Sequence, residues 1–316
     1  MRELYPGTEP FVQHSIEVGD GHVLHVAEFG RPDGHPVLVI HGGPGAGSAA
    51  WHARLFDPEY YRVVLFDQRG CGQSLPHGSL ASNTTAHLLA DMERIREHLA
   101  IDHWYLLGGS WGATLAILYA GRHGERVDGV FLRGVFLGRP RDVAWLYGDG
   151  ARRLLPEAWA EFVAPLTPAE RDAPLAAHCR RLFGEDDIAR MTSARAWVLW
   201  EMRAATLQPD PAADNANAPC HAALAVARIG CHYFTHDCWL EADEVLTTAA
   251  ALGHVPAVIV HGRHDLVCPV EQAVTLAARW PGAELEIIEA AGHAGRQPAM
   301  TDALIRATDR FAHRRR

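Results

Sequence analysis

The chain has 316 residues and a net charge of −9, so it offers no basic face for nucleic acid, and we expect no nucleic-acid partner. Hydrophobic residues make up 48% and charged residues 21%, which is typical of globular proteins and excludes a disordered chain. No run approaches the ~18 consecutive apolar residues of a membrane span, and residues 1–6 contain no apolar signal segment, so we expect neither membrane association nor secretion.

Two alternating segments, residues 11–18 and 22–29, flank Gly19-Asp20-Gly21 and predict a β-hairpin. Short, continuous apolar runs follow, and such runs are typical of strands buried on both faces of a parallel sheet. These runs cover residues 37–40, 63–66, 105–107, 130–132, 255–260 and 285–288. Helical spacing of apolar residues predicts helices at 85–99, 111–119 and 270–280. The alternation predicts a doubly wound α/β sheet.

The middle of the chain breaks this rhythm, because residues 139–250 contain no run that resembles a strand. Residues 194–205 and 222–229 are typical of helices, and residues 208–219 between them are typical of a loop. We therefore predict a core formed by residues 1–138 and 251–316, with a helical cap at residues 139–250 inserted between the two halves of one sheet.

The six cysteines form no CxxC pair, and we interpret them as free thiols of a protein in a reducing cytoplasm. They lie at positions 71, 179, 220, 231, 238 and 268. Cys231, His232, His236 and Cys238 offer an alternative as metal ligands, but a loop or helix rich in polarisable side chains fits them better. We expect no metal and no organic cofactor.

A possible nucleophile lies in Gly108-Gly-Ser-Trp-Gly112, which matches G-x-S-x-G and connects a predicted strand directly to a predicted helix. A sharp turn in that context lifts the hydroxyl of Ser110 above the sheet. Asp265 and His293 follow the last two predicted strands, in the chain order Ser, Asp, His of α/β-hydrolases. His293 would take the proton of Ser110, and Asp265 would orient the imidazole. His264 is a rival base, which we interpret as structural because it adjoins Asp265.

A second glycine-rich turn, His41-Gly-Gly-Pro-Gly45, follows the strand predicted at 37–40. Backbone N–H groups can approach a substrate oxygen at such a turn, so Gly43 and Trp111 are the predicted oxyanion hole. A simple turn remains the alternative for this segment alone.

With these motifs in place, the sequence resembles the proline iminopeptidases (prolyl aminopeptidases) among the serine α/β-hydrolases, almost from end to end. Further segments carry the resemblance: Asp67-Gln-Arg-Gly-Cys-Gly-Gln-Ser74, Asn83-Thr-Thr85, Arg133-Gly-Val-Phe-Leu137, Trp197-Val-Leu-Trp-Glu201, Ala227-Arg-Ile229 with His232-Tyr-Phe234, and Asp265-Leu-Val-Cys-Pro269. The resemblance implies an α/β-hydrolase fold with a helical cap, and hydrolysis of the amide after an unblocked N-terminal residue, usually proline.

The resemblance also implies substrate contacts. Glu201 matches the acidic residue that holds the substrate's α-amino group, and a buried ammonium does need a carboxylate partner. Phe136 matches the aromatic side chain that packs on the proline ring, and Arg133 keeps the family's basic residue. Cys268 matches a thiol near the site, and Trp145 matches a cap tryptophan.

Three positions depart from the family pattern. Gly230 stands where a second amino-binding glutamate is expected, Leu146 where an aromatic residue is usual, and Gly148 where a glutamine is usual. All three changes shorten or neutralise side chains of the implied pocket, so we expect a wider pocket and relaxed selectivity for proline.

We therefore predict a serine aminopeptidase that acts on a small peptide or an aminoacyl amide. One alternative is an amide hydrolase that removes an aminoacyl group from a bulky non-peptide amine in a biosynthetic pathway. Another is a carboxylesterase, for which Glu201 would have no purpose. A catalytically dead α/β-hydrolase that serves as a binding module is the last, and the intact triad argues against it.

Overall fold

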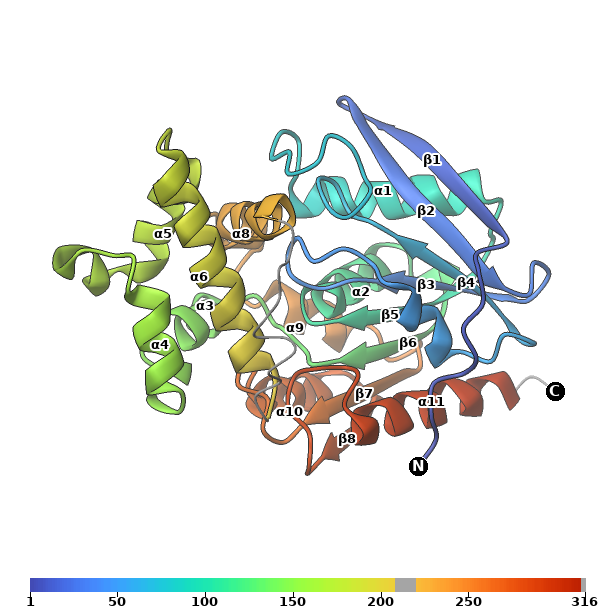
Figure 1. Ribbon diagram of the computed structural model, residues 1–316. Coiled ribbons are helices and arrows are strands. Elements are labelled where there is room, and N and C mark those ends of the chain that lie inside the picture. The colour runs from blue at the N-terminus through green and yellow to red at the C-terminus, as the bar shows by residue number, and fades with distance from the viewer. Residues whose placement is uncertain (208–219, 314–316) are drawn as a thin grey trace.

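The fold is built on one sheet of eight strands in the order β1-β2-β4-β3-β5-β6-β7-β8 (Figure 1). The computed structural model describes residues 1–207 and 220–313. The β1–β2 and β2–β4 pairs are antiparallel and the other pairs are parallel. The strands are β1 (Val12–Gly19), β2 (His22–Gly30), β3 (His35–Ile40), β4 (Tyr61–Phe66), β5 (Trp104–Gly109), β6 (Val127–Arg133), β7 (Ala257–Gly262) and β8 (Glu284–Ile288). The predicted α/β sheet is confirmed.

Helices cover both faces of this sheet. One face carries α1 (Thr85–His98), α2 (Trp111–Arg122), α9 (Glu244–Ala250) and α10 (Val270–Arg279), and the other carries η1 (Ala50–Leu55) and α11 (Pro298–His313). In β3, Leu38 and Ile40 pack on the first face, and Val37 and Val39 pack on the second. Because residues 37–40 of β3 are all buried, on one face or the other, this run has no polar alternation.

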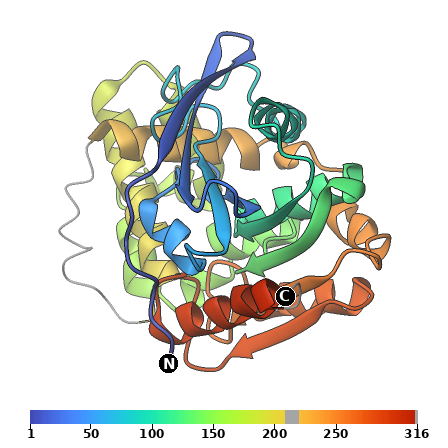
Figure 2. The same cartoon turned by 90° about the vertical axis from the view of Figure 1, so that its right-hand side faces the viewer.

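The β1–β2 hairpin projects at one edge of the sheet, at the top of Figure 2, and α11 runs across the bottom of the same view. Residues Gly19, Asp20 and Gly21 of its turn all have positive φ, of 83°, 54° and 76°. Glycine and aspartate adopt this left-handed conformation more easily than most residues, which explains the turn signal in the sequence.

The strand predicted at residues 255–260 begins two residues later than expected, at Ala257. Pro256 has no N–H to donate to the ladder, although its carbonyl accepts the N–H of Val130. The Val255 N–H instead bonds to the Leu252 carbonyl and closes the preceding turn.

Between residues 139 and 250, every described element of secondary structure is a helix. They are α3 (Pro140–Tyr147), η3 (Ala151–Arg153), α4 (Pro156–Val163), η4 (Pro168–Asp172), α5 (Pro174–Phe183), α6 (Asp187–Ala205), α8 (Cys220–Phe234), η5 (Asp237–Trp239) and α9. The central helix, α6, packs on α4, α5 and α8 beside the sheet (Figure 1). The loop predicted at 208–219 lies outside the described residues. The division into core and cap remains a prediction.

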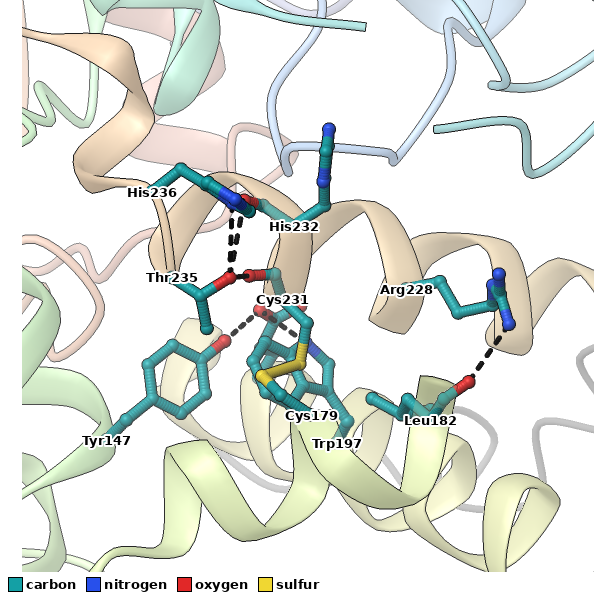
Figure 3. The surroundings of a disulfide bond; sticks show 10 residues. Tyr147, Cys179, Leu182, Trp197, Arg228, Cys231, His232, Thr235 and His236 are labelled. Carbon is teal, nitrogen blue, oxygen red and sulfur yellow. Dashed lines mark hydrogen bonds between the residues drawn. A yellow bond between two sulfur atoms is a disulfide. The ribbon is translucent and has the colours of Figure 1, made fainter. Parts of the chain in front are cut away.

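A disulfide joins Cys179 of α5 to Cys231 of α8, with the two Cα atoms 5.6 Å apart (Figure 3). The prediction that all six cysteines are free is therefore wrong for this pair. Packing of the two helices brings together thiols that are 52 residues apart in the chain, and no local spacing reveals such a pair. Cys71, Cys238 and Cys268 are free and buried.

None of the described helices combines the length and the apolar character needed to cross a bilayer. Within the same residues, no three His, Cys, Asp or Glu side chains come together as a metal site would require. The disulfide also removes Cys231 from the metal-ligand alternative considered above.

Candidate active site

Ser110 lies in a sharp turn between β5 and α2, with φ 57° and ψ −123°, a strained conformation for a non-glycine residue. Its flanking glycines permit the turn. A Cβ on Gly112 would lie 2.0 Å from the Ile40 carbonyl oxygen, and a Cβ on Gly108 would lie 2.3 Å from that of Gly112. Strand, turn and helix approach too closely for any side chain at these two positions, so the G-x-S-x-G pattern has a steric cause.

His293 and Asp265 form a hydrogen-bonded pair, with 2.7 Å between His293 Nδ1 and Asp265 Oδ2. Asp265 Oδ1 accepts the backbone N–H groups of Val267 at 3.0 Å and Cys268 at 2.7 Å. Burial alone would raise the pKa of Asp265, but His293, His261 and the Cys268 N–H outweigh it and hold that pKa below its usual value. The ionised carboxylate keeps the proton on Nδ1 and leaves Nε2 of His293 unprotonated, as a general base requires.

A second imidazole, His261, lies against the same carboxylate and was not singled out as functional in the sequence. Its Nδ1 accepts the Val135 N–H at 3.1 Å, so its Nε2 carries the proton and donates to the Cys268 carbonyl at 2.8 Å. That Nε2 is 3.4 Å from Asp265 Oδ2. Burial lowers the pKa of His261, so it supports the Asp265 loop as a neutral donor. His264, the rival base, is exposed.

The glycine-rich turn after β3 packs directly on Ser110. A Cβ on Gly42 would meet the Ser110 Cβ at 3.0 Å, and Gly43 has a φ of 117°. His41 fixes this turn, because its Nε2 accepts the Gln68 N–H at 3.0 Å and its Nδ1 is 2.9 Å from the Gly42 carbonyl. We keep the assignment of Gly43 and Trp111 to the oxyanion hole as a proposal.

A cavity of about 290 Å³ is lined by Ser110 and opens between the sheet end and the helices of the predicted cap. Eight predicted site residues line it: Gly43, Ser110, Arg133, Phe136, Leu146, Glu201, Cys268 and His293. Four others do not: Trp111, Trp145, Gly230 and Asp265. A larger depression of about 720 Å³ lies between β8 and α11, but ion pairs such as Arg306–Glu286 fill its lining and no nucleophile lies there.

Glu201 on α6 is the carboxylate that the cap contributes to this cavity. Its Oε1 accepts the Trp197 Nε1–H at 3.0 Å and also the O–H of Tyr147. Burial raises the pKa of Glu201 to about 7, although both hydrogen bonds act in the opposite direction. Tyr147 was not among the predicted site residues, although the predictions did concern its neighbours Trp145, Leu146 and Gly148.

The other predicted site residues contact the loops around the cavity or its wall. Arg133 donates from Nη1 to the His293 carbonyl at 2.7 Å and so braces the catalytic loop. Trp145 donates to the Leu266 carbonyl at 2.9 Å, which ties α3 to the loop after Asp265. Phe136 is buried at the cavity wall. Burial raises the pKa of the Cys268 thiol well above its usual value.

Gly230 and Gly148, two of the three departures from the family pattern, do not line the cavity. A Cβ on Gly230 would lie 3.3 Å from Trp197 Cζ2, so this position faces the indole that donates to Glu201. A Cβ on Gly148 would lie 2.5 Å from the Ala144 carbonyl oxygen. Among the three, Leu146 alone is a lining residue.

Comparison with known proteins agrees with this architecture. Residues 35–295 match the model of the alpha/beta hydrolase fold family. The chain is 44% identical to a proline iminopeptidase of Xanthomonas citri over 313 residues, covering 99% of this chain and all of the relative. A proline iminopeptidase of Xylella fastidiosa is also 44% identical, over 98% of this chain and 100% of its own length. The chain belongs to the proline iminopeptidase family.

Among solved structures, a proline iminopeptidase from Mycobacterium smegmatis superposes with a TM-score of 0.60 over 96% of this chain and 98% of the other. At 18% sequence identity, that likeness shows the shared fold alone.

Proposed function

We propose that this member of the proline iminopeptidase family is a serine aminopeptidase that cleaves the amide bond after an unblocked N-terminal residue, prolyl residues included. The observation that carries the proposal is the position of Glu201, a half-buried carboxylate in the same cavity as Ser110 and His293. A buried carboxylate without a cation is costly, and an ammonium from the substrate supplies one.

The chemistry follows from the triad. Ser110 attacks the carbonyl carbon of the N-terminal residue while His293 Nε2 takes its proton. The N–H groups of Gly43 and Trp111 bind the oxyanion, and His293 then protonates the leaving amine. Water, activated by the same imidazole, hydrolyses the acyl-enzyme. Asp265 stabilises the imidazolium in both steps.

Recognition of the free amino group determines where the enzyme cleaves. Because the pKa of Glu201 is raised to about 7, the empty site holds a carboxyl group near half ionisation at neutral pH. An ammonium bound beside it favours the ionised form. A blocked, uncharged substrate offers no such partner, so we expect N-acetylated substrates to be poor.

Selectivity among N-terminal residues depends on the cavity wall. Leu146 is the one departure from the family pattern that lines the cavity, so the proposal of a widened pocket now depends on this position. One or two methylenes in an apolar pocket distinguish substrates by only ~10–200-fold. We therefore propose a modest preference for proline over alanine.

The cytoplasmic location was expected because all cysteines were predicted to be free thiols. That argument no longer supports it, because Cys179 and Cys231 are paired.

The test is a panel of naphthylamides of Pro, Ala, Gly and Leu, with N-acetylated and ester controls, assayed on the wild type and on Ser110→Ala. We expect turnover of free aminoacyl amides, and a loss of roughly 10⁴–10⁶ in rate for the variant. Faster turnover of simple esters than of any free aminoacyl amide would favour a carboxylesterase. A variant that keeps a tenth of the activity would mean that Ser110 is not the nucleophile.

A further inference from the structure

Both protein hydrogen bonds to Glu201 reach the same oxygen. Tyr147 and Trp197 each donate to Oε1, and no hydrogen bond to Oε2 comes from the described part of the chain. Oε2 can therefore accept one N–H of a substrate ammonium. A primary or secondary ammonium carries at least two N–H donors, so a second protein acceptor is needed if the cavity is to pair both donors of a secondary ammonium.

The other carboxylate that lines the cavity, Asp142, is already occupied. It forms a buried ion pair with Arg139, whose guanidinium donates to both oxygens at 2.8 Å, and it also accepts the Arg139 backbone N–H at 3.0 Å. At Gly230, beside Trp197, this chain has no side chain at all. Neither position supplies the missing acceptor.

Tyr147 has the right chemistry and a fixed position. Its hydrogen is donated to Glu201, which leaves lone pairs of the phenolic oxygen free to accept. The ring is 3% exposed, stacks on Trp197 with 4.5 Å between centroids, and packs against Phe234 at 5.5 Å. The phenol lines the same cavity as Glu201 and Ser110.

The disulfide adds to this fixed arrangement. Cys231 follows Gly230 on α8, and a Cβ on Gly230 would lie 3.3 Å from the Trp197 indole on which Tyr147 stacks. Figure 3 shows the disulfide beside the Tyr147 and Trp197 rings. The cap thus holds the phenol in place before substrate arrives, which lowers the entropic cost of binding.

We propose that Tyr147 is the second acceptor for the substrate's amino group, so that the site holds an ammonium between Glu201 Oε2 and Tyr147 Oη. The inference rests on the proposed aminopeptidase function and deepens it. A prolyl ammonium has two N–H donors, and both are satisfied. A primary ammonium has a third donor that neither group accepts, and a tertiary N-methylprolyl ammonium has one donor and leaves Tyr147 Oη unused.

The experiment compares prolyl- and N-methylprolyl-naphthylamide on the wild type and on Tyr147→Phe. Because a hydrogen bond from a charged donor is involved, we expect the wild type to be at least roughly tenfold lower in kcat/KM on the N-methyl substrate. Tyr147→Phe should lose at least roughly tenfold on the prolyl substrate, mainly through KM, and less than about threefold on the N-methyl substrate.

Tyr119→Phe is the matched control. Tyr119 is also a buried phenol that donates to a glutamate, Glu93, but it lies on α2 outside the cavity. We expect this variant to keep the selectivity of the wild type, with both variants checked for folding by thermal melting.

Equal losses on the two substrates for Tyr147→Phe would overturn the proposal. A tyrosine with a merely structural role would affect both substrates alike, whatever their number of N–H donors. Equal kcat/KM on the two substrates for the wild type would also overturn it, and this comparison needs no variant that folds. A wild type that cleaves N-acetylated prolyl amides as fast as free ones would instead refute the proposed function, and with it the role of Glu201.

Discussion

Glu201→Gln separates recognition of the amino group from support of the fold. The amide is nearly isosteric with the carboxylate, and its oxygen can still accept from Tyr147 and Trp197, which both donate to Oε1. These two donors fix the amide with its oxygen towards them and its NH₂ group in the place of Oε2. A substrate ammonium then meets N–H donors where it met an acceptor.

The magnitude follows from that orientation. Loss of a hydrogen bond to a charged group costs about 1.5–3 kcal/mol, which is roughly 10–150-fold in kcat/KM. The amide NH₂ group cannot accept a hydrogen bond from the ammonium, and its N–H donors also repel the ammonium. We therefore expect a loss of kcat/KM near the upper end of that range on prolyl-naphthylamide. On the N-acetylated substrate, which has no charge there, we expect a change of less than about threefold.

The assay measures kcat/KM for both substrates on the wild type, on Glu201→Gln and on Glu161→Gln. Glu161 is an exposed glutamate of the cap helix α4, so its variant controls for loss of charge on the cap. Equal losses on free and acetylated substrates would refute the reasoning, because they would mean that Glu201 supports the cavity rather than binds the amino group.

Four further outcomes are expected. Burial raises the pKa of Glu201 from 4.5 to about 7, so its ionisation should remove about 3 kcal/mol of unfolding free energy as pH rises through that window. Urea titrations at pH 4 and 8 bracket the window, and Glu201→Gln should abolish the loss; parallel curves for both proteins would contradict the assignment. Reduction of the Cys179–Cys231 disulfide, which spans 52 residues, should lower the unfolding free energy by about 4 kcal/mol, and Cys179→Ser should be insensitive to reductant. Cys268 is 1% exposed beside Ser110, so a bulky thiol reagent should inactivate slowly by steric blockage, and Cys268→Ala should stay active and resist it; equal inactivation of both would point to another thiol. The prolyl to alanyl ratio of kcat/KM should stay below roughly a thousand, and a larger ratio would exclude the widened pocket.

The grouping of Ser110, Asp265 and His293 could be predicted because the signals of these residues are local. Ser110 lies in a pattern that directly joins a strand to a helix, and Asp265 and His293 each follow a recognisable strand, so chain order alone places all three at one edge of the sheet. The steric reason for the pattern, a Gly112 pressed against the Ile40 carbonyl, connects residues more than seventy positions apart and needed the structure.

The lining residues of the cap helices were harder to predict, because each side chain reaches the cavity only if it points towards it. A helix turns by about 100° per residue, so consecutive residues cannot all face one cavity. In α3 the resemblance drew attention to Trp145 and Leu146, and to Gly148 just beyond it, whereas the structure places Leu146 and Tyr147 at the cavity. The pairing of Cys179 with Cys231 likewise depends on how α5 and α8 pack, which no spacing of cysteines encodes.

The turn around Ser110 also indicates how the enzyme can be altered. Backbone atoms of β3, β5 and α2 fix Ser110 at separations that exclude a Cβ at Gly108 and Gly112. The proposed amino-group site, by contrast, consists of side chains that project from α3, α6 and α8. Libraries for laboratory evolution should therefore randomise the cap helices and leave the glycines unchanged. The geometry around Ser110 would then stay unchanged while variants are selected for new substrates.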